Sequence, residues 1–311
     1  MAIKIVTDST SDLDPNLADD FGITVVPLNV HFGEKVFKDG IDLNTDEFFD
    51  KLINGTVFPS TSQPSIGEFV DIYNQISEPN DVIISIHVSS KLSGTINSAQ
   101  QAANTVSGNV DVRIVDTQQV SMTVGLSALG AAKAAKEGKS VDECISIAES
   151  IAKRSNFFAL FDTLEYLEKG GRIGKARSLI GGLLKIRPIL RVEDGEIGQF
   201  SKARSRNMGL MKLEQAVQDL GQLDDIAIVY STDDLDAKSL ATSVEHLLPD
   251  NRSPFLTRVG PVIGTHAGPN LVAIAAISSD YIWKGTIEFS LSGYISVLQV
   301  ILFLHRHENQ S

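Results

Sequence analysis

Small hydroxyl side chains gather at several junctions where a predicted strand leads into a predicted helix. The junctions lie at residues 8–11, 61–65, 89–95 and 116–117, with Ser121 soon after the last. Ser, Thr and Asp cap helices by accepting hydrogen bonds from the free amides of the first turn, and capping alone explains any single junction. A helix N-terminus also attracts anions, and several junctions at the carboxyl ends of one sheet would converge. The pattern therefore predicts a site for a small anion or a carboxylate.

Within this pattern, Ser93-Gly94-Thr95 is the strongest candidate, because Gly94 lets a ligand approach the backbone closely. His266 is the second candidate. It stands in the sequence GTHAGP (264–269), which we interpret as a tight turn between two apolar strands. A histidine in such a turn either donates a hydrogen bond to an acid or lies idle on the surface, and the sequence alone favours neither.

Several catalytic signatures are missing from the chain. It contains no GxGxxG, HExxH or GxSxG sequence, so the nucleotide-binding, zinc-protease and serine-hydrolase classes lack their motifs. Asp8 and Asp116 end predicted strands and could act as bases or metal ligands, although turn structure explains both equally well. A hydroxyl-rich, histidine-assisted site without a base and nucleophile is typical of binding rather than of catalysis.

Composition limits the partners and the compartment. The chain has 311 residues, 42% of them hydrophobic, and a formal net charge of −12, which argues against a nucleic-acid partner. Its single cysteine, Cys144, excludes an intrachain disulfide and lies in a predicted helix as a buried thiol. The N-terminus reads as a strand and not as a signal peptide, so we expect a cytoplasmic protein.

The first half of the chain alternates strands with helices. Strands are predicted at residues 3–6, 24–28, 82–86 and 110–115, and amphipathic helices at 46–53, 67–76, 93–106, 121–137 and 141–154. This alternation predicts an α/β domain over residues 1–154, with a parallel sheet covered by helices on both faces.

The second half has a different pattern. Strands are predicted at 157–161, 188–192, 197–201, 226–230, 255–259, 262–265 and 271–277, and helices at 164–169, 206–220 and 236–247. Asp194-Gly195 marks a hairpin turn. We expect a second α/β domain with a mixed or antiparallel sheet over residues 155–278, and an extension of unknown role over 279–311. The apolar stretch 294–304 is too short to span a bilayer.

Six sequence segments, in this order, resemble the DegV family. They are VTDSTSDL (6–13), TSQPS (61–65), SSKLSGT (89–95), LEYLEKGGRIG (164–174), LLKIRPIL (183–190) and HAGP (266–269). The resemblance implies a two-domain α/β carrier of long-chain fatty acids such as palmitate, stearate or oleate, with no metal or cofactor. Some relatives serve as the non-catalytic subunit of bacterial fatty acid kinase, whose separate kinase subunit makes acyl phosphate for phospholipid synthesis.

The resemblance also assigns residues. Thr61, Ser93 and His266 would contact the carboxylate, with Ser62 and Gly94 beside them, and an apolar tunnel would hold the acyl chain. Two basic clusters, around Arg172 and around Arg204, read as solvated surface without the family. With it, they are candidates for docking to an acidic kinase surface or for transient contact with anionic lipid.

Two other functions stay open at this point. The chain could be a hydrolase or transferase of acyl esters or phosphates, with Ser93 as nucleophile and His266 as base. It could also be a structural or regulatory module with a vestigial pocket.

The turn after His266 has Asn270 where relatives have a small residue, and Asn270 tolerates the left-handed backbone that such a turn needs.

Overall fold

Four parallel strands form the first sheet. A computed structural model describes residues 2–106, 110–179, 186–249 and 252–279. The strand order is β2-β1-β6-β7, with the strands at Ile3–Asp8 (β1), Ile23–Val26 (β2), Val82–His87 (β6) and Asp111–Asp116 (β7). All pairs in this sheet are parallel. The predicted strands and their parallel arrangement are therefore confirmed.

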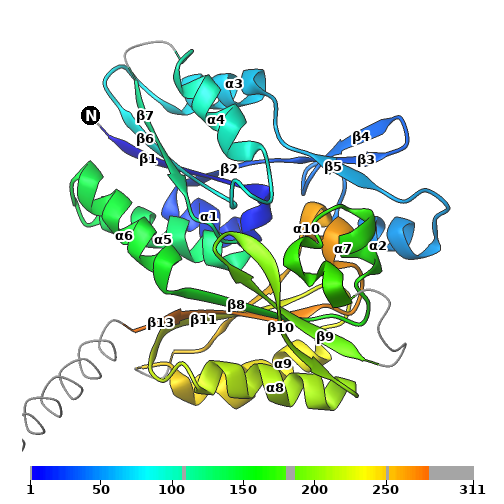
Figure 1. Ribbon diagram of the computed structural model, residues 1–311. Coiled ribbons are helices and arrows are strands. Elements are labelled where there is room, and N and C mark those ends of the chain that lie inside the picture. Colours follow the sequence, from blue (N-terminus) through cyan, green and yellow to red (C-terminus); the bar gives the residue numbers. More distant parts are fainter. Residues whose placement is uncertain (1, 107–109, 180–185, 250–251, 280–311) are drawn as a thin grey trace, which may run out of the picture.

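Helices cover both faces of this sheet (Figure 1). Alternate strand residues face opposite sides, so Val6 packs with Phe69 and Tyr73, whereas Ile5 packs in the cluster that contains Leu126. The first face carries α3 (Ile66–Ile76) and α4 (Thr95–Ala103), and the second carries α1 (Pro15–Phe21), α5 (Met122–Lys136) and α6 (Val141–Arg154).

The second sheet has six strands in the order β10-β9-β8-β13-β11-β12. Their bounds are Ser155–Leu160 (β8), Arg187–Glu193 (β9), Glu196–Ala203 (β10), Leu223–Tyr230 (β11), Phe255–Arg258 (β12) and Val272–Ser278 (β13). Only β11 and β12 pair in parallel; the other pairs are antiparallel, so the expected mixed sheet is confirmed. Asp194 and Gly195 both have positive φ at the β9–β10 turn, as the Asp-Gly sequence predicts.

The two sheets share a core. Helix α5 lies between them and buries most of its residues, and one apolar cluster runs from Ile5 through Leu126 to Ala275. On the outer side of the second sheet lie α8 (Arg206–Gln218), α9 (Leu235–Val244) and the short 3-10 helix η3 (Glu245–Leu247). Strand β8 begins directly after α6, but because the core is continuous, the domain bounds 1–154 and 155–278 stay a prediction.

A small third sheet corrects the expected turn at residues 61–65. Strands β3 (Asn29–Phe32), β4 (Lys35–Lys38) and β5 (Ser60–Ser62) pair antiparallel beside α2 (Thr45–Asn54). Thr61 and Ser62 therefore lie in a strand. Strand β5 has only three residues, all of them polar, so it lacks the apolar alternation that marks a strand in sequence.

Residues 262–265, expected as a strand, belong instead to helix α10 (Pro261–Ala267). His266 is consequently in the last turn of a helix and not in a tight turn. The helix begins at Gly260 and Pro261, ends at Gly268 with φ 73°, and packs near α7 (Glu165–Lys169) and α2. Pro at the first helical position is a helix-start signal that outweighs the β-branched Val262 and Ile263.

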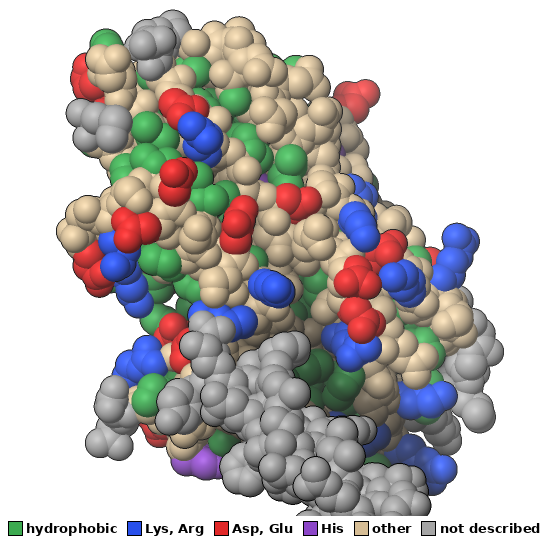
Figure 2. Space-filling view, turned by 60° about the vertical axis from the view of Figure 1, so that its left-hand side comes forward, with side chains coloured by type: hydrophobic (Ala, Val, Ile, Leu, Met, Phe, Trp, Pro, Cys, Tyr) green, Lys and Arg blue, Asp and Glu red, His purple; other side chains and the backbone are tan. Residues whose placement is uncertain are grey.

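The C-terminal extension from residue 280, including the apolar stretch 294–304, lies outside the described residues. Within the described ranges, no helix is both long and apolar enough to cross a membrane. On the face shown in Figure 2, acidic and basic side chains are interspersed and form no continuous basic surface.

Candidate functional site

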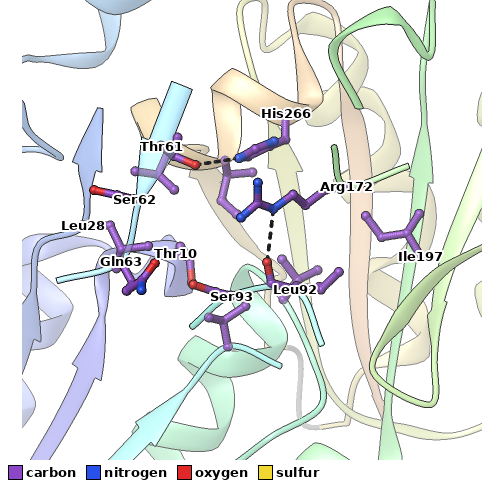
Figure 3. A pocket seen from close by; sticks show the side chains of 14 residues that line it. Thr10, Leu28, Thr61, Ser62, Gln63, Leu92, Ser93, Arg172, Ile197 and His266 are labelled. Carbon is purple, nitrogen blue, oxygen red and sulfur yellow. Dashed lines mark hydrogen bonds between the residues drawn. The ribbon is translucent and has the colours of Figure 1, made fainter. Parts of the chain in front are cut away.

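A largely apolar cavity opens between the carboxyl ends of the parallel strands, β5 and α10 (Figure 3). The empty space of the cavity, open mouth included, is about 520 Å³. The apolar lining comes from Leu28, Val88, Leu92, Val120, Ile197, Val262 and Ile263, and the polar lining from Thr10, Thr61, Ser62, Gln63, Ser93, Arg172 and His266. Four of the five expected carboxylate-binding residues thus line one cavity.

Thr61 and His266 meet across this cavity. Thr61 Oγ1 lies 2.9 Å from His266 Nε2, and both side chains are half-buried. Burial lowers the pKa of His266 to about 4, with the nearby Arg172 guanidinium acting in the same direction. The imidazole is therefore neutral near pH 7 and acts as a hydrogen-bonding group rather than as a cation.

Gly170 leaves room for this imidazole. A Cβ at Gly170 would lie 2.2 Å from His266 Nδ1, so any side chain there would collide with the ring. Its φ is −77°, which every residue adopts, so the backbone conformation does not require glycine. The neighbouring Gly171 does need it, with φ +69° and open space around it. Gly170 therefore leaves space for the ring of His266, whereas Gly171 supplies the left-handed backbone after α7.

Ser93 lies in the loop between β6 and α4. Its Oγ is 2.8 Å from Thr95 Oγ1, and it accepts a hydrogen bond from the Thr95 amide at 3.3 Å. Gly94 is not among the lining residues of the cavity. Its missing side chain instead admits Gln63, whose Nε2 would be 2.9 Å from a Cβ at this position. The glycine thus helps to shape the wall beside Ser93.

Ser62 faces a second histidine. His31 Nε2 lies 2.9 Å from Ser62 Oγ, whereas the adjacent Thr61 contacts His266. Neighbouring strand residues point to opposite sides, so β5 distributes its two hydroxyls between two imidazoles.

Arg172 lies in the cavity wall. Its Nε donates to the Leu92 carbonyl at 3.2 Å (Figure 3). Its Nη1 donates to the Gly170 carbonyl at 2.9 Å. Arg204, by contrast, is exposed beyond the end of β10 and does not line the cavity. The two arginines that the sequence grouped as docking residues therefore occupy different environments.

A Ser-His-Asp chain exists deeper in the first sheet. Ser85 Oγ lies 2.6 Å from His87 Nε2, and His87 Nδ1 lies 2.8 Å from Asp8 Oδ2. All three residues are fully buried, so no substrate reaches them. Asp8 also accepts from the Thr10 amide at 3.0 Å and from the Val88 amide at 3.2 Å, and both of these residues line the cavity. The hydrogen bonds among Ser85, His87 and Asp8 thus support the cavity wall at Thr10 and Val88.

The β9–β10 hairpin is tied to the loop that carries Ser93. Ser89 Oγ donates to the Gly195 carbonyl and Lys91 Nζ to the Asp194 carbonyl, each at 2.7 Å. Ile197 on this hairpin lines the cavity.

Among the described residues, no group of three or more His, Cys, Asp or Glu side chains is arranged to hold a metal ion. Cys144 is buried, as expected, and burial raises the pKa of its thiol.

Comparison with known proteins identifies the family. The family model described as "Uncharacterised protein, DegV family" matches residues 2–279. The chain belongs to the DegV family. A DegV domain-containing protein of Clostridium acetobutylicum is 37% identical over 281 residues, which cover 88% of this chain and 97% of the relative. One of Streptomyces coelicolor is 36% identical over 279 residues, covering 89% and 98%.

Solved DegV structures share the fold. A fatty-acid-binding DegV family protein of Thermus thermophilus has a TM-score of 0.82 at 32% identity, covering 90% of this chain and 100% of that one. DegV of Bacillus subtilis, a fatty acid binding protein, has a TM-score of 0.80 at 31% identity with the same coverage. A stearic acid-binding protein of Eubacterium ventriosum has a TM-score of 0.79 at 26% identity, covering 89% and 98%.

Proposed function

We propose that this DegV protein binds one long-chain fatty acid, such as palmitate, stearate or oleate, in the cavity at β5 and α10. Thr61, Ser93 and His266 would hold the carboxylate, with Ser62 and Gly94 beside them. The observation that carries the proposal is the placement of hydroxyl and imidazole groups around an otherwise apolar cavity. The fatty acids bound by the similar DegV structures support it.

The energetics divide between the two ends of the ligand. Each buried methylene contributes roughly 0.8 kcal/mol, so a chain of more than a dozen supplies most of the affinity. Hydrogen bonds to the carboxylate contribute less, because both partners lose water, but they fix which end lies at Thr61. A neutral His266 fits this function, since it donates one hydrogen bond without needing its own counter-ion.

Carrier function is favoured over hydrolysis by the hydrogen bonds around the cavity. Ser93 pairs with Thr95, and His266 pairs with Thr61, so the nucleophile and base of the hydrolase alternative do not contact each other. His266 Nδ1 is buried and has no hydrogen-bond partner among the described residues, so no carboxylate orients it as a base.

The acid bound in this way would be presented to a separate kinase subunit and converted to acyl phosphate for phospholipid synthesis. The exposed Arg204 is the more accessible docking residue, whereas Arg172 would act from the cavity wall. Transient contact with anionic lipid would deliver the fatty acid, and the cytoplasm is the compartment that fits this exchange.

Native mass spectrometry of gently purified protein tests the proposal, because one bound acyl chain adds a defined mass. Stearate uptake by the delipidated protein should be lost or weakened in Ser93→Ala and Thr61→Val, and kept in Ser90→Ala, which changes an exposed serine nearby. A protein that arrives empty and takes up no fatty acid would refute the proposal. Acyl-ester turnover without a partner, abolished by Ser93→Ala, would support the hydrolase instead.

A further inference from the structure

Two buried carboxyl groups meet the start of α10. Asp12 Oδ1 accepts a hydrogen bond from the Gly260 amide at 2.8 Å, and its Oδ2 accepts one from Ser121 Oγ at 2.6 Å. The Asp12 carbonyl accepts a third from Thr257 Oγ1 at 2.7 Å. Asp12 therefore joins the first turn of α10 and strand β12 to the beginning of α5, which packs on the parallel sheet.

Asp39 approaches the same turn from the small sheet. A Cβ at Gly260 would lie 3.0 Å from Asp39 Oδ1, so the carboxyl group rests directly against the Gly260 backbone. The Asp39 amide donates to the carbonyl of Leu28, a cavity residue, at 2.9 Å. Asp39 is 5% exposed, and neither of its carboxyl oxygens has a hydrogen-bond partner within the described part of the chain.

The surroundings of the pair disfavour two negative charges. The Ser9 hydroxyl and the Val262 amide face Asp39 and lower its pKa somewhat. The negative charge of Asp8 raises the pKa of both Asp12 and Asp39. Burial dominates and raises the pKa of Asp39 to about 7, and it raises the pKa of Asp12 well above the usual range. The pair therefore retains a proton near neutral pH.

Helix α10 carries three cavity residues, Val262, Ile263 and His266. A shift of its first turn would move all three relative to Thr61, because they lie within two turns of one hydrogen-bonded helix. We propose that Asp12 and Asp39 are positioning residues that hold α10 against the N-terminal half of the chain and so place His266 against Thr61. Because the Asp39 carboxyl group lies against the Gly260 backbone and near the buried carboxyls of Asp12 and Asp8, a negative charge on Asp39 would repel these groups and weaken the hold on this turn. The consequence for ligand binding rests on the proposed fatty-acid function.

Ligand-free protein gives the first test. Nitrogen-15 NMR of the imidazole rings reports the tautomer and hydrogen bonding of His266, and the His266→Gln variant assigns its signal among the six histidines. Asp12→Ala should shift the His266 signals, and Asp12→Asn should restore them in part, because an amide oxygen still accepts from Gly260. Should Asp12→Ala fail to fold, Ser121→Ala deletes a single Asp12 contact and should produce a smaller shift in the same direction.

Stearate binding at pH 6 and pH 8 gives the second test. Asp12→Ala should weaken binding about tenfold, the equivalent of one lost hydrogen bond. The wild type should bind roughly fivefold more weakly at pH 8 than at pH 6, a modest coupling between sites. Asp39→Asn should remove this pH dependence, and Asp71→Asn, which neutralises an exposed acid on α3, should keep it.

Unchanged His266 signals in folded Asp12→Ala, or a wild-type pH dependence of binding in Asp39→Asn, would overturn the proposal. A wild type that binds no stearate would refute the fatty-acid function instead. The NMR comparison would still decide whether the two carboxyl groups position His266.

Discussion

Thr61 Oγ1 and His266 Nε2 lie 2.9 Å apart although 205 positions separate the two residues in the chain. The contact joins an edge strand of the smallest sheet to the last turn of α10. The contact therefore forms only when β5, which carries Thr61, and α10, which carries His266, are both correctly placed. Changes at or behind this contact should alter ligand binding more than they alter the fold.

Replacing His266 tests the contact directly. His266→Ala should weaken stearate binding by about 10- to 100-fold, the equivalent of a hydrogen bond to a charged group. His266→Gln should lose less, because its amide can still reach Thr61. Isothermal titration at pH 7 measures both, and His246→Ala, on an exposed histidine of η3, is the control. Equal affinity in all three variants would exclude His266 from the site.

Gly170→Ala should disturb the same site from behind. The new Cβ would lie 2.2 Å from His266 Nδ1, so the ring must move, at a cost of about 1–3 kcal/mol of stability. Gly171→Ala is the matched control, because it strains a φ of +69° and costs about 1 kcal/mol without approaching any side chain. Urea denaturation should show both losses, but only Gly170→Ala should weaken stearate binding. Comparable weakening in both variants would contradict the clearance argument.

Stability should depend on pH through Asp39. Its pKa rises from 3.8 in the unfolded chain to about 7 in the fold, so the folded state holds a proton that the unfolded state releases between these values. The free energy of unfolding contributed by Asp39 is therefore present at low pH and lost as the pH rises from about 4 to 7, by on the order of 2–4 kcal/mol.

Asp39→Asn isolates this contribution. The lowered pKa of His266 acts in the opposite direction below about pH 6.5, but it is common to both proteins and cancels in their difference. Urea denaturation from pH 5 to pH 8 should show the variant gaining stability relative to the wild type. A constant difference across this range would mean that Asp39 does not titrate there.

The hydrogen bonds between the β9–β10 hairpin and the loop after β6 give a fourth prediction. Ser89→Ala removes the donor to the buried Gly195 carbonyl and should cost about 1–3 kcal/mol, with faster amide exchange along β9 and β10. Ser90→Ala, which loses only an exposed bond to Asp116, should cost under about 0.5 kcal/mol. Hydrogen exchange followed by mass spectrometry compares the two. Unchanged exchange in the Ser89 variant would show that the tip is held by other contacts.

Sequence patterns predicted the large elements well, because buried strands and amphipathic helices leave long periodic signals. They failed at α10, where Val262 and Ile263 suggested a strand although Gly260-Pro261 marks a helix start. They also missed β5, which has only three residues and gains its stability from β3. Short elements take their conformation from neighbours, so their own residues carry little information.

The candidate site shows the same division. Ser93, Thr61 and His266 could be singled out by residue type, by turn context and by resemblance to the family. The functions of Gly170 and Asp39 could not, since one leaves space for a ring and the other rests against a distant backbone. Such relationships exist only after folding has brought α7, α10 and the small sheet together.

The length of helix α10 determines where His266 lies. Asp12 binds the amide of Gly260 at the start of the helix, and His266 lies in its last turn. The number of residues between them therefore sets the position and the orientation of the imidazole. One added or deleted residue would turn the ring by about 100° and move it by about 1.5 Å along the axis. The length of α10 between Gly260 and His266 is therefore as important to the site as the identity of His266 itself.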